Sequence, residues 1–141
     1  MGIETTRIYL DSCLVIYLVE EHSAFYELVH RAIVETPSAE FCISSLVEME
    51  CLVGPLKLRD SELVASYENF FATVTRLRVP DSAYRTAAQL RANHGLKTPD
   101  ALHLAIALYH GCDQLWSNDD RLARAAGSRS VDILAQKTSE K

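Results

Sequence analysis

Carboxylates at four separated positions are the residues of this chain best suited to metal chemistry. Asp11 directly follows a short apolar run with the composition of a buried strand, and Asp119 closely follows a second such run. Glu50 and Asp100 stand on stretches with helical spacing. Acids that gather in one crevice repel one another, and some take up protons unless a cation compensates. Mg²⁺ and Mn²⁺ prefer such oxygen ligands, so the pattern predicts a divalent metal site where a fold brings these acids together.

The elements that must position these acids follow from the alternation of short apolar runs and amphipathic stretches. Strands are predicted over residues 7–10, 41–43, 74–79, 114–116 and 131–134, and helices over residues 13–20, 23–35, 46–53, 60–71, 82–93, 99–109 and 121–126. The ends, 1–6 and 137–141, are expected to be loose. Strands separated by helices imply parallel pairing and a three-layer α/β/α sandwich with a mainly parallel central sheet. If the first and fourth strands are neighbours, Asp11 and Asp119 flank one crevice.

Local signals at the helix after the second strand separate Glu50 from its neighbour Glu48. Ser45 and Glu48 stand three residues apart and fit a capping box, which gives Glu48 a structural role. Glu50 projects from nearly the opposite face and has no such local explanation. Gly54-Pro55 predicts the end of this helix.

Capping signals also mark two other helix starts. Ser23 suits the N-cap of the second helix. Thr98 suits the N-cap of a later helix, with Pro99 at its first position and Asp100 in its first turn, where the helix dipole favours an ionised acid.

Each candidate also has an ordinary structural interpretation. A strand-end Asp often caps the following helix, which applies to Asp11 and to Asp119, and Asp120 competes with Asp119 for the same site role. His103, three residues after Asp100, is expected to pack or hydrogen-bond locally rather than bind metal. Ser117 and Asn118 are candidates to orient a water or ligand from behind the acids.

The bulk composition bounds the function classes. The chain of 141 residues is expected to form one domain, 1–141, and its net charge of −5 argues against a protein that coats nucleic acid through a basic surface. It does not exclude a metal nuclease. The sequence shows no signal peptide and no apolar run of the roughly 20 residues that a membrane span needs, so a cytoplasmic location is expected. The four cysteines are expected to be buried thiols.

Four motifs, in order, resemble those of the PIN-domain family, and specifically its VapC-type toxin ribonucleases from type II toxin–antitoxin pairs. They are Ile8-Tyr9-Leu10-Asp11-Ser12, Ser44-Ser45-Leu46-Val47-Glu48-Met49-Glu50-Cys51-Leu52-Val53-Gly54, Thr98-Pro99-Asp100-Ala101-Leu102-His103-Leu104-Ala105 and Leu115-Trp116-Ser117-Asn118-Asp119. Each motif alone is weak, and their order and separations carry the resemblance across nearly the whole chain. The family usually has Thr where this chain has Ser117, which keeps the hydroxyl.

The resemblance implies a function and a set of partners. The family's acidic quartet corresponds to Asp11, Glu50, Asp100 and Asp119, which would hold Mg²⁺ or Mn²⁺, as one ion or two. It implies endonucleolytic cleavage of RNA (tRNA, rRNA or mRNA), inhibition by a cognate antitoxin protein, and a homodimer. A surplus of large apolar residues before the third strand would form a groove for a partner helix.

Two other function classes compete with the nuclease. A non-catalytic PIN-fold module that binds RNA or protein would share the fold, and the presence of all four acids favours the enzyme over it. A phospho-acceptor receiver domain would need an acidic pair near the end of the first strand and a lysine at a late strand end. Asp11 has no such partner beside it, and Lys137 lies in the tail.

Overall fold

The computed structural model describes residues 5–132 and 134. Its strands are β1 (Arg7–Leu10), β2 (Glu40–Ser44), β3 (Thr75–Leu77), β4 (Gln114–Trp116) and β5 (Ser130–Val131). Its helices are α1 (Ser12–Val19), α2 (Tyr26–Val34), α3 (Ser45–Lys57), α4 (Ser61–Phe71), α5 (Asp81–His94), α6 (Thr98–Tyr109) and α7 (Asp120–Ala126), followed by the 3₁₀ turn η1 (Gly127–Arg129).

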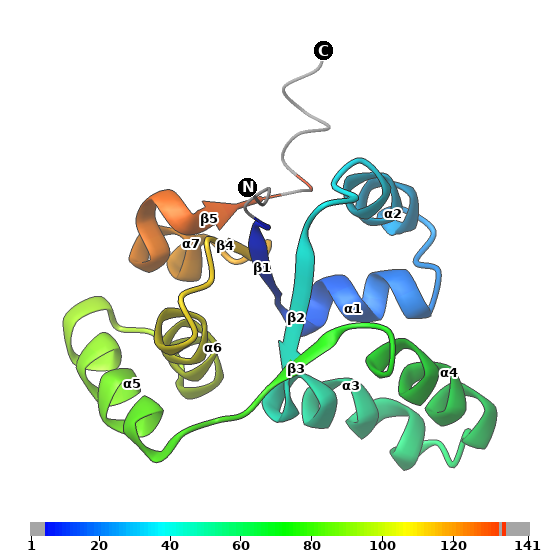
Figure 1. Ribbon diagram of the computed structural model, residues 1–141. Coiled ribbons are helices and arrows are strands. Elements are labelled where there is room, and N and C mark those ends of the chain that lie inside the picture. Colours follow the sequence, from blue (N-terminus) through cyan, green and yellow to red (C-terminus); the bar gives the residue numbers. More distant parts are fainter. Residues whose placement is uncertain (1–4, 133, 135–141) are drawn as a thin grey trace.

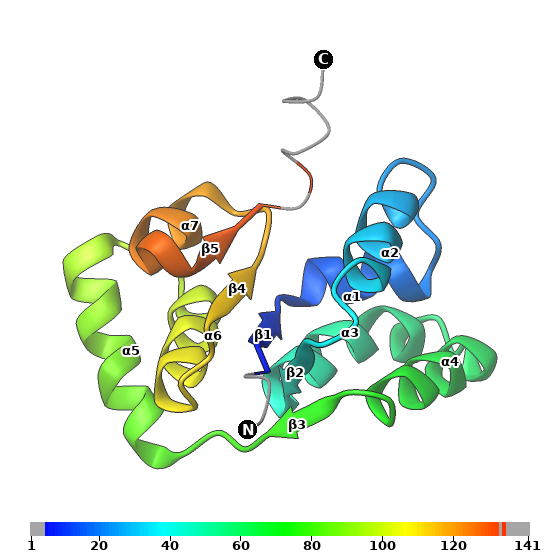
Figure 2. The same ribbon diagram turned by 45° about the horizontal axis from the view of Figure 1, so that its top comes forward.

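The strands form one parallel sheet in the order β3-β2-β1-β4-β5. Helices α1–α4 pack together on one face and α5–α7 on the other, so the sheet is the middle layer of three (Figures 1 and 2). Right-handed crossovers require this division, because connections that step in opposite directions along a sheet place their helices on opposite faces. The predicted α/β/α sandwich is confirmed.

The strand order reverses between β1 and β4. The chain builds β2 and β3 on one side of β1 and then returns to place β4 and β5 on the other side. Leu10 pairs with Trp116 at the carboxyl ends of β1 and β4, and the Asp11 amide donates to the Trp116 carbonyl at 3.0 Å. In open α/β sheets such a reversal opens the crevice that receives ligands. The predicted adjacency of the first and fourth strands is therefore confirmed.

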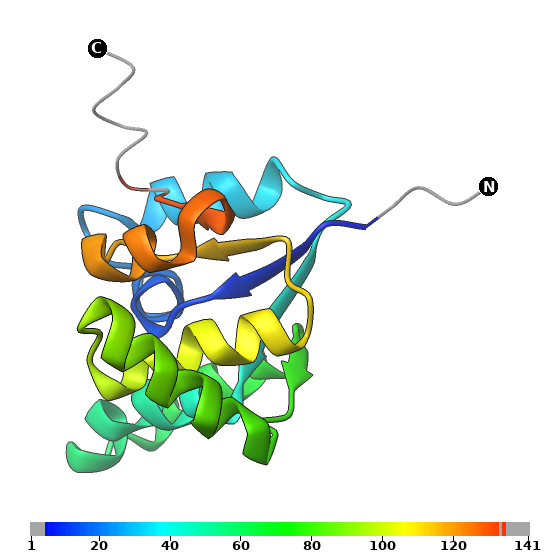
Figure 3. The same cartoon turned by 90° about the vertical axis from the view of Figure 1, so that its left-hand side faces the viewer.

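Helix α6 is the most deeply buried helix of the described part. Every residue from Ala101 to Ala107 is buried, so the helix is enclosed on all sides, whereas a surface helix keeps a polar face. Its partners are α5, against which it packs most extensively, and the sheet (Figure 3). Small and aliphatic side chains allow this close packing, and they make α6 a rigid platform for any polar residue that it carries.

The predicted end of the helix after β2 is wrong, because α3 runs through Gly54 and Pro55 to Lys57. Pro55 is buried on the same face as Cys51, and this packing outweighs the loss of one helical hydrogen bond. The chain leaves the helix through Arg59, two residues past its end, whose φ of 56° is the left-handed conformation that usually favours glycine. The Arg59 amide donates to Leu56 and the Asp60 amide to Pro55, which are the two bonds of a Schellman motif.

Other predicted boundaries also shift. Helix α2 starts at Tyr26 and not after Ser23, because the His22 ring accepts the amides of residues 24 and 25 and holds them in a turn. Lys97, not Thr98, is the N-cap of α6. Strand β3 is shorter than expected, and β5 ends at Val131; the predicted continuation to 134 and the predicted tail fall partly or wholly outside the described residues. None of the described helices is long and apolar enough to cross a membrane.

Candidate metal centre

Asp11 lies at the carboxyl end of β1 and is 7% exposed. Its Oδ1 accepts the Ser12 amide at 2.7 Å, so it caps α1, and its Oδ2 accepts the Ser117 hydroxyl at 2.7 Å. The structural and functional interpretations of Asp11 therefore coexist, because the cap fixes the carboxylate at the sheet's switch point. Ser117, predicted to act from behind the acids, contacts Asp11 directly from the end of β4.

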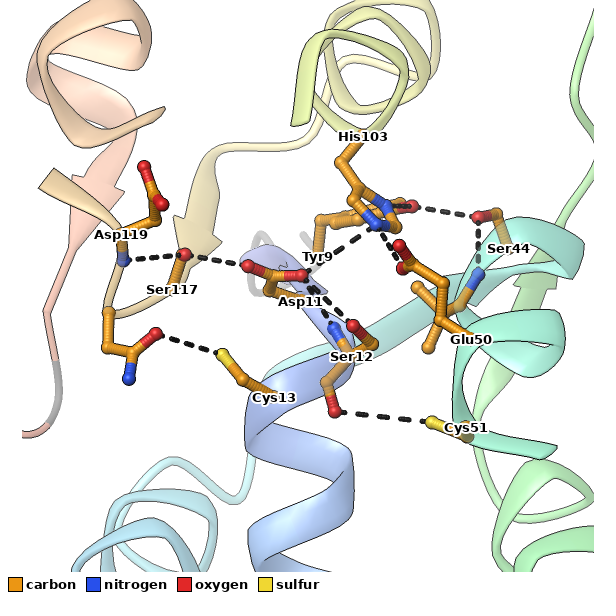
Figure 4. Close-up of polar contacts among 12 residues, drawn as sticks. Tyr9, Asp11, Ser12, Cys13, Ser44, Glu50, Cys51, His103, Ser117 and Asp119 are labelled. Atoms are coloured by element: carbon orange, nitrogen blue, oxygen red, sulfur yellow. Dashed lines mark hydrogen bonds and ion pairs between the residues drawn. The ribbon is translucent and has the colours of Figure 1, made fainter. Parts of the chain in front are cut away.

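Glu50 reaches Asp11 from α3 and meets His103 from α6 (Figure 4). One ligand atom from each of these three residues lies within 4.8 Å of the other two. His103 Nε2 is 2.6 Å from Glu50 Oε1 and 3.7 Å from Asp11 Oδ1. Burial raises the pKa of Glu50, but the hydrogen bond and charge of His103 outweigh it, and the net pKa lies below the ordinary value. Glu50 is therefore held as a carboxylate.

Asp100 lies in the first turn of α6, as predicted, one turn before His103. Its pKa is raised, first by burial and then by the negative charges of Asp119 and Asp11. Glu50 raises it further, and His103 partly compensates. The other three predicted acids thus act on Asp100, although Asp100 and Asp119 lie outside the tight group formed by Asp11, Glu50 and His103.

Asp119 is half-buried at the turn between β4 and α7, whereas Asp120 is exposed. Asp119 Oδ1 accepts the Leu122 amide at 2.9 Å and so caps α7, and its own amide donates to Ser117 Oγ at 3.1 Å. Among the carboxylates that raise the pKa of Asp100, Asp119 has the largest effect. The geometry therefore favours Asp119 over Asp120 as the acid that faces the centre.

A depression of about 360 Å³ opens on this side of the centre. It is lined by Lys97, Asp100, Asn118, Asp119, Asp120 and Arg121. Two cations therefore border the acids where solvent reaches them, which is a suitable arrangement for contacts to a phosphate backbone.

Asn118 makes two hydrogen bonds that the sequence did not predict. Its Oδ1 accepts the Cys13 thiol at 3.2 Å, and its Nδ2 donates to the Tyr17 hydroxyl at 3.3 Å. The side chain is thus turned toward α1 and ties the β4–α7 turn to that helix. Its recorded contacts do not include any of the acids among the described residues.

Glu48 is separate from the centre, as predicted, but for another reason. The N-cap of α3 is Ser44, whose hydroxyl accepts the Val47 amide, so the expected capping box at Ser45 is wrong. Glu48 instead receives two hydrogen bonds from Arg76 of β3, at 2.6 and 2.7 Å. This forked ion pair explains the residue without any role in chemistry.

Three residues of the centre were missed as functional candidates. His103 forms a hydrogen bond, as expected, but its partner Glu50 lies 53 positions away. Its other ring nitrogen is 2.7 Å from the hydroxyl of Tyr9, which is 2.8 Å from that of Ser44. One available signal was the spacing of Asp100 and His103, since residues three apart share a helix face.

The donor set fits a divalent cation. Asp11 and Glu50 offer oxygens a few ångströms apart, and Asp100 and Asp119 add further carboxylates beside them. Hard cations such as Mg²⁺ are held by a few carboxylates together with water, and they relieve such repulsion.

Comparison with known proteins agrees with this fold. The model of the PIN domain family matches residues 8–128. The chain is similar to DNA-bound VapBC from Salmonella typhimurium, with a TM-score of 0.76 and 22% identity over 92% of this chain and 99% of that one. It is also similar to a toxin–antitoxin complex from Klebsiella pneumoniae, with a TM-score of 0.74 and 21% identity over 89% and 97%.

A third similar structure is the sarcin–ricin loop cleaving toxin VapC20 from Mycobacterium tuberculosis, with a TM-score of 0.72 and 14% identity over 86% of this chain and 97% of that one. At these identities the likeness concerns the fold. No curated protein sequence matches the chain. The family model covers most of the chain, including all four acids and helix α6, and the chain belongs to the PIN domain family.

Proposed function

We propose that this chain is a VapC-type toxin, a Mg²⁺- or Mn²⁺-dependent endoribonuclease that hydrolyses phosphodiester bonds of cytoplasmic RNA. The observation that carries the proposal is that Asp11 and Glu50 meet at the switch point, where burial and then the charges of neighbouring acids raise the pKa of Asp100. No lysine or arginine forms an ion pair with Asp11 or Glu50 among the described residues. The carboxylates would hold the cation, with Asp11 and Glu50 as its nearest ligands. A cation bound there supplies Lewis-acid stabilisation of the charge that develops on a phosphate.

The chain's own residues would prepare this centre. Ser117 fixes Asp11 through its hydroxyl and at the same time accepts the Asp119 amide, so it sets the spacing of these two acids. Lys97 and Arg121 border the exposed side and would bind phosphate oxygens of the RNA backbone. Because these contacts touch only backbone, they position a substrate without choosing its sequence.

The test compares an acid of the centre with an exposed acid elsewhere in the same assay. Purified wild type is incubated with total RNA in Mg²⁺, in Mn²⁺ and in EDTA, and Asp11→Asn and Asp81→Asn follow in the same buffers. We expect cleavage by the wild type only with metal, none by Asp11→Asn, and nearly normal cleavage by Asp81→Asn, whose side chain is exposed at the start of α5. Equal RNA integrity with wild type and Asp11→Asn would contradict the nuclease and favour the non-catalytic module.

An antitoxin partner is the second part of the proposal. Similar folds occur in toxin–antitoxin complexes. An apolar groove of about 440 Å³ supports a docking helix on the α1–α4 side; its lining includes Leu18, Ile33, Phe41, Phe70 and Val74. Of the predicted surplus apolar residues, Phe70 lines this groove, whereas Phe71 is buried in the core. Co-purification with the product of the adjacent gene tests this part. A folded chain that does not bind that product would contradict it.

A homodimer is the third part. Met49, Val53 and Leu56 expose apolar side chains along one face of α3, and Leu58 extends this surface beyond the helix. Exposed apolar surface of this kind marks protein contacts. Light scattering of the wild type and of Leu56→Glu measures the oligomeric state. We expect the wild type to be a dimer and the introduced glutamate charge to weaken that dimer.

A further inference from the structure

A row of hydrogen bonds crosses the molecule behind Glu50 (Figure 4). It starts at the Val47 amide, which is 3.4 Å from Ser44 Oγ, and passes to the Tyr9 hydroxyl at 2.8 Å. From Tyr9 it reaches His103 Nδ1 at 2.7 Å, and from His103 Nε2 it reaches Glu50 Oε1 at 2.6 Å. The three inner residues come from three different elements, β2, β1 and α6, and all are buried. They therefore have no solvent to replace a missing partner.

The two ends of this row fix its direction. An amide only donates, and a carboxylate only accepts. With these ends fixed, each inner group accepts one hydrogen and donates one: Ser44 to Tyr9, Tyr9 to His103 Nδ1, and His103 Nε2 to Glu50. If the direction between His103 and Ser44 were reversed, the Ser44 hydroxyl hydrogen would have no acceptor among the contacts of the described residues. A buried hydroxyl whose hydrogen has no acceptor destabilises the fold, which disfavours the reversal.

We propose that His103 is a positioning residue of the metal centre and not a ligand of the metal, because Tyr9 and Ser44 hold its ring with the hydrogen on Nε2, directed at Glu50 Oε1. This inference rests on the proposed metal site. A histidine that ligates a metal presents a nitrogen without hydrogen. Here that nitrogen is Nδ1, and the Tyr9 hydroxyl covers it. Nε2 therefore lies close to both acids because it donates a hydrogen bond to Glu50, and not because it coordinates the metal.

The hydrogen bond gives Glu50 a defined donor atom. A glutamate side chain is flexible, and ordering it costs rotamer entropy at the moment of binding. The hydrogen bond from His103 occupies Oε1 before a cation binds, so Oε2 remains the oxygen that Glu50 offers to the cation. Partners that orient a ligand in this way contribute about 10- to 100-fold in metal affinity. We expect the Tyr9–Ser44 support to contribute toward the lower end of that range, since it acts through His103.

The ring tautomer and the metal's ligands are measured on the full chain without RNA. Nitrogen NMR of ¹⁵N-histidine protein at mildly alkaline pH should show hydrogen on Nε2 of His103 and none on Nδ1. Electron spin-echo spectra of bound Mn²⁺ should show no directly coordinated histidine nitrogen. The inference would be overturned if Nε2 of His103 carried no hydrogen. It would also be overturned if the Mn²⁺ spectra showed a nitrogen coupling that disappears in His103→Gln.

Matched variants test the support through Mn²⁺ affinity by calorimetry. Tyr9→Phe removes only a hydroxyl and should weaken Mn²⁺ binding about 10-fold. Tyr67→Phe is the control, because Tyr67 is equally buried and its hydroxyl also makes a side-chain hydrogen bond, to the carboxylate of Glu20, away from the centre. We expect unchanged affinity there. His103→Gln, which keeps an N–H donor, should bind Mn²⁺ more tightly than His103→Ala.

Circular dichroism of each variant separates lost folding from lost positioning. Equal affinity in folded Tyr9→Phe and wild type would overturn the inference, as would equal loss in the two His103 variants. Because these measurements need no RNA, a chain that binds Mn²⁺ in this way and cleaves no RNA would contradict the proposed nuclease while supporting the role of His103.

Discussion

The two sides of the acidic centre are built differently. On one side, Asp11 and Glu50 are tied to hydrogen-bond donors from Ser12, Ser117 and His103. On the other side, Asp100 has a raised pKa from burial and neighbouring acids, and Asp119 is bound mainly to the start of its own helix. The first side has its geometry before any cation arrives. On the second side, neighbouring acids repel the Asp100 carboxylate, and a bound cation would relieve that repulsion.

This difference indicates that the acids of one carboxylate cluster have two different roles. Donor-bound acids fix where a cation sits, because their oxygens cannot reorient without losing buried hydrogen bonds. Asp100, for which no hydrogen-bond donor is found among the described residues, supplies affinity, because its repulsion with the other acids falls when the cation binds. Variants of the two sides should therefore have opposite effects on the stability of the metal-free protein, although both impair binding.

The largest expected effect comes from the donor-bound side, with Glu50→Gln. We expect RNA cleavage to fall by more than about 100-fold, because the variant removes a ligand charge and not only its support. Glu48→Gln is the matched control on the same helix; its forked pair with Arg76 lies apart from the centre, so cleavage should be nearly unchanged. Similar losses in both variants would contradict the assignment of Glu50.

Asp100→Asn tests the second side of the centre. The raised folded-state pKa means that ionising Asp100 costs stability, which is lost as pH rises through that pKa. The amide avoids this cost, so the Tm of the metal-free variant near neutral pH should rise by about 2 °C, a small value because the group is partly exposed. Mn²⁺ affinity should fall. Differential scanning fluorimetry without and with Mn²⁺ measures both changes.

Asp81→Asn provides the control for Asp100→Asn. Asp81 also occupies the first turn of a helix, α5, but it is exposed and has no role in the centre. Its loss removes only a favourable dipole interaction, so its Tm should stay level or fall slightly. A Tm rise in Asp81→Asn equal to that in Asp100→Asn would show that repulsion among the acids is not the cause.

Ser117→Ala should have an intermediate effect. It removes the hydroxyl that Asp11 accepts and that the Asp119 amide contacts, so it loosens the link between the two sides. We expect Mn²⁺ affinity to fall about 10-fold, measured by calorimetry. Ser66→Ala, which removes a hydroxyl bonded only to its own helix, should leave affinity unchanged.

The smallest expected effect lies at the opposite end of the sheet. Glu40 at the start of β2 has a lowered pKa, first because of its hydrogen bond from Arg7 at 2.9 Å and then that from Thr75. A lowered folded-state pKa gives stability above the unfolded pKa, and that stability is lost as pH falls through the folded value. Glu40→Gln should therefore lose less stability on acidification, by under about 1 kcal/mol for so exposed a pair. Urea unfolding at several acidic pH values measures it.

Much of this architecture was accessible from local patterns. The bounds of β1 and β4 agree with the prediction, and the parallel order follows from helices between strands. The misplaced end of α3 has a tertiary cause, since burial of Pro55 beside Cys51 carries the helix past a strong local stop signal. The contact between His103 and Glu50 depends on the placement of α6 over β1 and β2, which no spacing rule contains.

The central position of β1 has a consequence for synthesis. Ser117 lies 106 residues beyond Asp11, and His103 lies 53 beyond Glu50. A chain that leaves the ribosome can pair β1 with β2 and β3 early, but Asp11 keeps an open flank until β4 has emerged and closed a long loop. The centre is therefore among the last features to assemble. Nascent and truncated chains that lack β4 carry both donor-bound acids without the serine and the turn that complete the site.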